Sequence, residues 1–140
     1  MNNSVDQRHL AAALLYALLG LVLGIFMAAS HNHGQAVTHA HLLLVGFLLS
    51  FAYAVIGRLW LGGEGGLLRQ CQFWGHHLGV VGLVVGLFLL YGGSRPLAVL
   101  EPLLAGSSIL VLLALALMTV LVWRAERSPG SDVLPNIAGA

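Results

Sequence analysis

The feature that most constrains this chain is a series of four long apolar segments, each close to the length that crosses a lipid bilayer. They cover residues 10–30, 40–61, 73–91 and 102–123. About 20 apolar residues in a helix span a hydrocarbon core of about 30 Å, and a spanning backbone must satisfy its own hydrogen bonds. The sequence therefore predicts an all-α membrane protein, a bundle of four transmembrane helices.

The composition agrees with a chain that has lipid as its main solvent. Of its 140 residues, 59% are hydrophobic and only 8% are charged, whereas a soluble domain carries about 25% charged residues. The lipid bilayer is thus the first predicted partner, and a net charge of +1 argues against nucleic acid. We expect one transmembrane domain over 1–128 and a flexible tail over 129–140, which is polar and contains Pro and Gly.

The arginines predict the orientation. Five of the six fall on one side of a four-span topology and only Arg95 on the other; the five are Arg8, Arg58, Arg69, Arg124 and Arg127. Positive charge gathers in cytoplasmic loops. We therefore expect a protein of the cell membrane (inner or plasma membrane) with both termini on the cytoplasmic side. Trp60, Trp74 and Trp123 mark helix ends on that same side, as an aromatic belt does.

Histidines are the candidate chemical groups. Neutral imidazole is the commonest metal ligand and an axial ligand of many haems, and polar groups at membrane depth indicate function. Six of the seven histidines lie at a span end or inside a span: His31, His33, His39, His41, His76 and His77. The single cysteine excludes a thiolate-rich metal cluster.

His39 and His41 are two residues apart, so on a helix they point about 200° apart and cannot hold one ion together. The face below His39 is small and polar, with Gly46, Ser50, Tyr53 and Gly57. The face below His41 is apolar, with Leu44, Leu48, Ala52 and Ile56. His39 is therefore the stronger candidate for a cofactor ligand; the alternative is that both histidines cap the helix start and contact water.

The third segment carries a stripe of small residues, Gly75, Gly79, Gly82 and Gly86. Such a stripe lets a neighbouring helix, or a flat macrocycle, approach the backbone closely. His76 flanks this stripe and His77 points almost away from it. The first segment has a similar stripe, which favours tight packing: Ala13, Ala17, Gly20 and Gly24.

His31 and His33 stand in the loop before the second segment. With His39 or His41 they form a candidate copper or zinc site facing outward. The alternative is a solvated pair with no ligand.

The stretch THAHLLLVGFLLSFAYAVIGRLW resembles the second helix of haem–copper oxidase subunit I and of its nitric oxide reductase relatives. The resemblance is to small four-span proteins related to subunit I, and it covers residues 38–88. It places His39 at the position of the low-spin haem ligand, which implies a b-type haem. The HAH string also resembles the family's His-aromatic-His motif, whose alternate histidines bind two haems, with Ala40 replacing the aromatic residue.

The string FWGHHLGVVG resembles the adjacent histidine pair that binds copper in those oxidases. In this chain His76 and His77 lie near the opposite end of their span from His39, on the order of 20 Å away in depth at 1.5 Å per residue. One ion is therefore not expected to join His39 and His76 within a chain.

Subunit I contains twelve helices in three four-helix arcs. The resemblance implies that this chain corresponds to one arc and that three copies form the ring as a homotrimer. It also implies a haem-binding protein for electron transfer or diatomic gas binding. The alternatives are copper or zinc handling, and a cofactor-free structural or assembly subunit. No CxxCH or copper–cysteine motif occurs, so we expect no complete oxidase or reductase in this chain alone, but a respiratory-chain partner.

Overall fold

Four long helices dominate the computed structural model, which describes residues 4–62 and 66–127. α1 covers Val5–Ser30, α4 covers Leu67–Tyr91 and α5 covers Leu97–Arg127. The second span is continuous and consists of α2 (Ala36–His41), the π-helical segment η1 (Leu42–Leu48) and α3 (Leu49–Trp60). All four spans are long and apolar enough to cross a membrane, and the described residues contain no strand, so the predicted four-span, all-α fold is confirmed.

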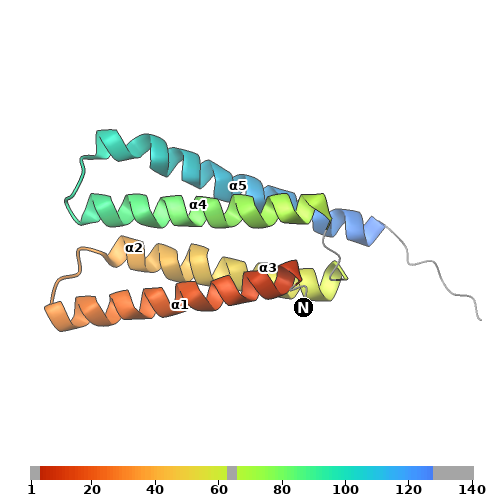
Figure 1. Cartoon of the computed structure of the whole chain (residues 1–140), viewed down its shortest axis with the longest axis horizontal. Helices are drawn as coiled ribbons and strands as arrows, with labels where there is room; N and C mark the ends of the chain where they lie inside the picture. The colour runs from red at the N-terminus through yellow and green to blue at the C-terminus, as the bar shows by residue number, and fades with distance from the viewer. Residues whose placement is uncertain (1–3, 63–65, 128–140) are drawn as a thin grey trace, which may run out of the picture.

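The spans are arranged as two hairpins that lie side by side (Figure 1). One hairpin consists of α1 and the α2–η1–α3 span, and the other consists of α4 and α5. α4 also contacts α1, α2 and η1. It is accordingly the most buried span, with 44% of its apolar window inside the protein against 17% for α5. The contact between the hairpins therefore depends mainly on α4.

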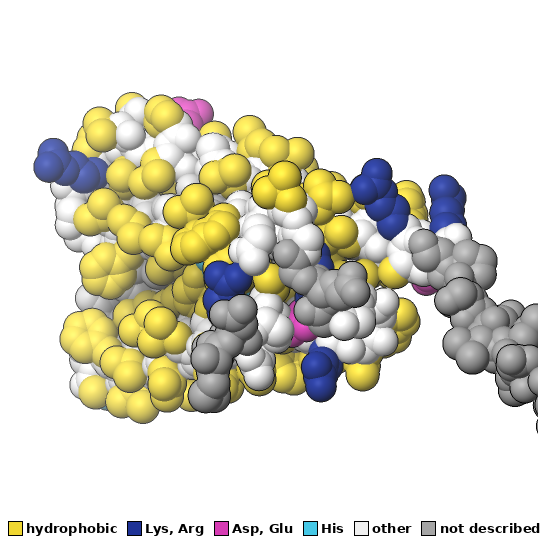
Figure 2. Space-filling view, turned by 45° about the vertical axis from the view of Figure 1, so that its right-hand side comes forward, with side chains coloured by type: hydrophobic (Ala, Val, Ile, Leu, Met, Phe, Trp, Pro, Cys, Tyr) yellow, Lys and Arg dark blue, Asp and Glu magenta, His cyan; other side chains and the backbone are white. Residues whose placement is uncertain are grey.

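The two ends of the bundle differ in charge. α1 begins, α3 ends, α4 begins and α5 ends at the same end, which we call the arginine-rich end because five of the six arginines lie there. The opposite end carries the connections 31–35 and 92–96, with Arg95. Figure 2 shows hydrophobic side chains over the sides of the bundle, with dark blue side chains mostly toward the end turned to the viewer.

The helices extend beyond the apolar segments from which we predicted them. α1 begins at Val5 rather than at residue 10, because Ser4 and Gln7 form a capping box in which each side chain bonds the other's backbone N–H. α4 begins at Leu67 rather than at residue 73, since its first two turns carry polar side chains that point inward. α5 begins at Leu97 and includes Pro102, which removes only one amide close to the exposed start of the helix. The predicted tail, 129–140, lies outside the described residues.

The glycine stripe of α4 packs against α5. A Cβ at Gly79 would lie 2.9 Å from the carbonyl oxygen of Ser107 and 2.9 Å from a side-chain carbon of Val111. Gly82 and Gly86 face Ser107 and Leu104 in the same way. Of the two interpretations of this stripe, the structure confirms close helix packing.

Candidate functional site

Polar side chains from three spans meet inside the arginine-rich half of the bundle, and we call them the inner cluster. They are Asp6, His9 and Tyr16 of α1, Ser50 and Tyr53 of α3, and Arg69, Gln72, His76 and His77 of α4. All nine are buried. Burying polar groups is costly unless they are hydrogen-bonded, and groups of this kind inside a membrane span indicate a functional site.

Three imidazoles form the centre of the inner cluster. His76 and His77 follow each other on α4, and His9 faces them from α1. The ring centroids are 5.0 Å apart for His9 and His77, 5.0 Å for His76 and His77, and 6.1 Å for His9 and His76. Their exposed fractions are 1%, 0% and 8% for His9, His76 and His77. The three rings are thus neighbours in a region shielded from solvent.

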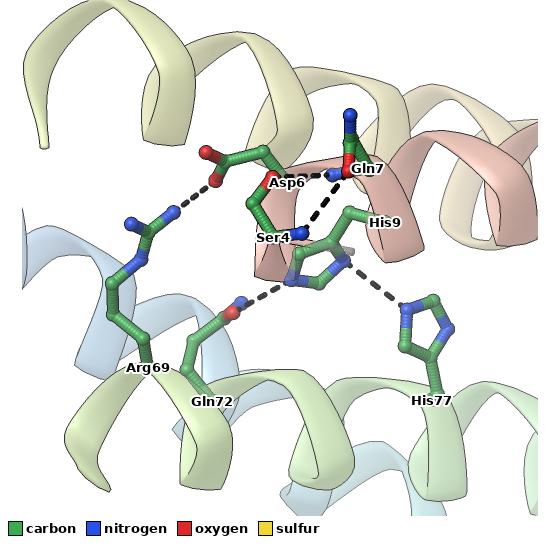
Figure 3. Close-up of polar contacts among 7 residues, drawn as sticks. All are labelled: Ser4, Asp6, Gln7, His9, Arg69, Gln72 and His77. Carbon is green, nitrogen blue, oxygen red and sulfur yellow. Dashed lines mark hydrogen bonds and ion pairs between the residues drawn. The ribbon is translucent and has the colours of Figure 1, made fainter. Parts of the chain in front are cut away.

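A chain of hydrogen bonds runs through two of these rings. The Tyr16 hydroxyl oxygen lies 3.1 Å from His77 Nδ1, His77 Nε2 lies 3.1 Å from His9 Nδ1, and His9 Nε2 lies 2.9 Å from Gln72 Oε1. The Gln72 oxygen only accepts, so His9 Nε2 donates to it. Neutral His9 then accepts from His77 Nε2, and His77 accepts from the Tyr16 hydroxyl. The chain, of which Figure 3 shows the part from Gln72 to His77, assigns one tautomer to each ring.

His76 has a hydrogen-bond partner on one ring nitrogen only. Ser50 Oγ lies 2.8 Å from Nε2, whereas Nδ1 is buried and has no partner within the described residues. The hydroxyl of Tyr53 is also buried without a partner there, and its ring meets that of His76 edge-on at 4.9 Å. Most buried polar atoms in proteins have a hydrogen-bond partner, so these two atoms are exceptions.

Asp6 and Arg69 close the inner cluster toward the arginine-rich end. Arg69 Nη2 donates to Asp6 Oδ1 in a buried ion pair (Figure 3). Gly57 of α3 lies against this pair, and a Cβ at that position would overlap both side chains. Sequence analysis placed Arg69 in the polar connection between spans; the structure places its side chain inside the bundle, because Asp6 neutralises its charge there.

His39 and His41 each bond a different backbone carbonyl. His39 Nδ1 donates to the Gly20 carbonyl oxygen at 2.9 Å and its ring lies against Gly24 of α1. His41 Nδ1 donates to the Val37 carbonyl oxygen, one turn earlier in its own helix, at 2.8 Å. The two rings thus have separate surroundings, as their spacing predicts.

The face of the second span below His39 is internal, as expected. Its four residues, Gly46, Ser50, Tyr53 and Gly57, are all buried, whereas Leu44 and Leu48 on the face below His41 are exposed toward lipid. His39 lines neither the groove of about 440 Å³ nor the groove of about 530 Å³ that the described residues form. The apolar groove of about 530 Å³ beside it is lined by Thr38 and Leu42 and by parts of α1 and α4, and not by His39.

His31 and His33 are exposed, and His31 ends α1 in a left-handed conformation with φ 53°. Within the described residues, no group of three or more His, Cys, Asp and Glu side chains, at either end of the bundle, is arranged closely enough to hold a metal ion as it stands.

Sequence reasoning missed His9, which it treated as lying before the first span. A signal for it exists: Asp6, His9, Ala13, Tyr16 and Gly20 recur at spacings of three and four, so they continue one face of α1. The same reasoning found His76 and His77 but not their partners, since no pattern in a single sequence pairs α1 with α4.

No family model matches this chain, and no curated protein or solved structure matches it either.

Proposed function

We propose that this chain is a metal-binding integral membrane protein, in which the imidazoles of the inner cluster hold a copper or zinc ion. The observation that carries the proposal is the arrangement of His9, His76 and His77. One nitrogen of each ring is engaged by an outer partner, Gln72, Ser50 or Tyr16 respectively. The other nitrogens of His9 and His77 bond each other, and that of His76 has no partner within the described residues.

This division of the ring nitrogens is typical of metal-binding histidines. A ligating imidazole usually donates its second N–H to an oxygen atom, which fixes the tautomer and the ring orientation. His9 Nδ1 and His77 Nε2 are already 3.1 Å apart, close to the separation of two ligands that are each about 2.0 Å from one ion. Imidazole ligands suit both copper and zinc.

Loading requires two local changes. The His9–His77 hydrogen bond is given up, and the proton of His77 moves from Nε2 to Nδ1, which then donates to the Tyr16 oxygen. The His76 ring turns so that the unpartnered Nδ1 faces the same point. Gln72, Tyr16 and Ser50 then orient the rings, and the surrounding apolar side chains exclude water. Metal handling is the copper or zinc alternative of the sequence analysis. That alternative expected the ligands among His31, His33, His39 and His41, whereas we propose His9, His76 and His77.

The second candidate is a b-type haem on His39, with His41 or an imidazole of a second copy as the other axial ligand. One observation favours it: the Gly20 carbonyl fixes the Nδ1–H tautomer of His39, which leaves Nε2 as the ligand atom. His39 does not line the 530 Å³ groove beside it, and we infer that such a haem would sit between chains, in the homotrimeric twelve-helix ring. It would support electron transfer or gas binding beside a respiratory-chain partner.

The same proposal includes the position of the chain in the membrane. We infer that it lies in a cell membrane with both termini in the cytoplasm. The five arginines at one end of the bundle support this orientation.

The experiment that tests both candidates uses the full chain, expressed with ample haem and purified in detergent. Metal content and the absorption spectrum are measured for the wild type, His9→Ala/His77→Ala, His39→Ala and the control His31→Ala/His33→Ala. One equivalent of copper or zinc that is lost only in His9→Ala/His77→Ala supports the inner site. A Soret band that is lost in His39→Ala supports haem instead, and protein free of metal and haem in all variants overturns both proposals.

A further inference from the structure

A groove of about 440 Å³ opens between the start of α1 and the end of α3, beside the inner cluster, with which it shares Asp6. Its polar lining residues are Ser4, Asp6, Gln7 and Arg58. Its apolar lining residues are Leu10, Phe51, Ala54, Val55 and Leu59. The proposed metal site does not use this groove.

Polarity changes along the groove with depth in the membrane. Ser4, Asp6 and Gln7 stand in or before the first turn of α1, and Arg58 stands in the last turn of α3. Phe51 is seven residues before Arg58, on the order of 10 Å deeper at 1.5 Å per residue. The groove is thus polar at headgroup depth and apolar at acyl-chain depth.

The polar part of the groove presents two opposite charges. Arg58 is exposed. Asp6 is 5% exposed, and while its Oδ1 accepts from Arg69, its Oδ2 is buried without a hydrogen-bond partner among the described residues. Figure 3 shows this second oxygen turned away from Arg69. A carboxylate oxygen buried in this way requires a donor.

We propose that this groove binds a phospholipid with a primary-amine, zwitterionic headgroup, that is, a phosphatidylethanolamine. Its ammonium group donates to Asp6 Oδ2 and its phosphate pairs with Arg58. One acyl chain lies along Leu10, Phe51 and Val55. A choline headgroup carries the same charges but no N–H donor, and a glycerol headgroup has hydroxyl donors but no positive charge, so neither offers Asp6 a charged donor.

The test is lipid binding to the full chain in detergent, followed by native mass spectrometry. The probes are phosphatidylethanolamine, phosphatidylcholine and phosphatidylglycerol with identical acyl chains. We expect the ethanolamine lipid to bind about tenfold more tightly than the choline lipid, since a hydrogen bond to a charged group contributes about 1.5 kcal/mol or more. Asp6→Asn is expected to remove this preference, and Arg58→Gln to weaken all three lipids.

Asp6→Asn also breaks the pair with Arg69 and can unfold the chain, so a second variant tests the groove alone. Val55→Trp fills the groove from its exposed wall and leaves Asp6 in place. Its matched control is Val85→Trp, which fills the separate 530 Å³ groove at the other end of α1. Retention of the ethanolamine lipid is expected to be lost in Val55→Trp and kept in Val85→Trp.

Two results overturn the proposal. Equal binding of the ethanolamine and choline lipids shows that Asp6 does not distinguish between the two headgroups. Preference for phosphatidylglycerol, or unchanged binding in Val55→Trp, shows a simple cationic surface at this end of the bundle. Neither result bears on metal or haem content, so this proposal and the proposed function fail separately.

Discussion

At the scale of single residues, the structure is organised by buried polar contacts between residues of different spans. The hydrogen-bond chain from Tyr16 through His77 and His9 to Gln72 joins α1 to α4. The pair of Asp6 and Arg69 connects the same two helices nearer the end. These contacts define which faces of α1 and α4 meet.

The hydroxyl of Tyr16 tests the hydrogen-bond chain. Tyr16→Phe leaves His77 Nδ1 buried without a donor, and we expect the free energy of unfolding to fall by about 1 kcal/mol. Thermal unfolding in detergent measures the change. The control is Tyr91→Phe at the exposed end of α4, and equal stability of the two variants would contradict the assigned bond.

The ion pair allows a sharper test. Arg69→Met leaves the Asp6 carboxylate buried without its cation, and we expect a loss of about 3 kcal/mol in the free energy of unfolding. The double variant Asp6→Leu/Arg69→Met removes both charges and is expected to recover most of that loss. Arg124→Met, which changes an exposed arginine, is the control for loss of charge alone. A double variant as unstable as Arg69→Met would argue against an ion pair.

At the scale of helices, small residues decide which spans pair closely. The stripe of Gly79, Gly82 and Gly86 lets α5 contact the backbone of α4 closely. Hydrophobic burial gives little preference among apolar helices inside a bilayer, so close packing has to select the partner.

Gly79→Leu tests this pairing. The new side chain would meet the Ser107 carbonyl and Val111, so α5 must move away, and we expect a fall of several degrees in the midpoint of thermal unfolding. Val81→Leu adds bulk two residues away, on the lipid-exposed side of α4, and is expected to leave the midpoint unchanged. Similar midpoints for the two variants would place the α4–α5 contact elsewhere.

At the scale of the whole molecule, the bundle is asymmetric between its ends. The arginine-rich end contains the inner cluster and the groove of about 440 Å³ between α1 and α3, whereas the opposite end contains the exposed His31 and His33. An apolar layer around Leu42 and Val80 separates the two polar regions. The two polar regions therefore lie at opposite ends of the bundle.

The orientation of the molecule can be measured directly. In a Cys71→Ser background, Ser94→Cys is expected to react with a membrane-impermeant maleimide on intact cells, because Ser94 adjoins Arg95 in the connection that we expect to face outward. Arg124→Cys is expected to react only after the cells are opened. The reverse pattern would place the termini outside.

Much of the fold follows from local sequence properties. Segment length and hydropathy determine four spans, the arginine count predicts their direction, and the spacing of Gly46, Ser50, Tyr53 and Gly57 determines which face of the second span is internal. These properties depend only on the bilayer thickness and the helical repeat, which are the same for every chain. The predictions drawn from these properties therefore required no knowledge of how the spans pack.

The site depended on information that the sequence does not carry in local form. His9 stands 67 residues before His76, and only the packing of α1 on α4 and α3 places the two rings near each other. Sequence reasoning gave His39 the leading role because it weighed each span alone, where His9 looked like a residue before the membrane. The tertiary structure decides which imidazoles are neighbours, because packing and buried hydrogen bonds between helices are long-range contacts, whereas the spans themselves form within a single segment of the chain.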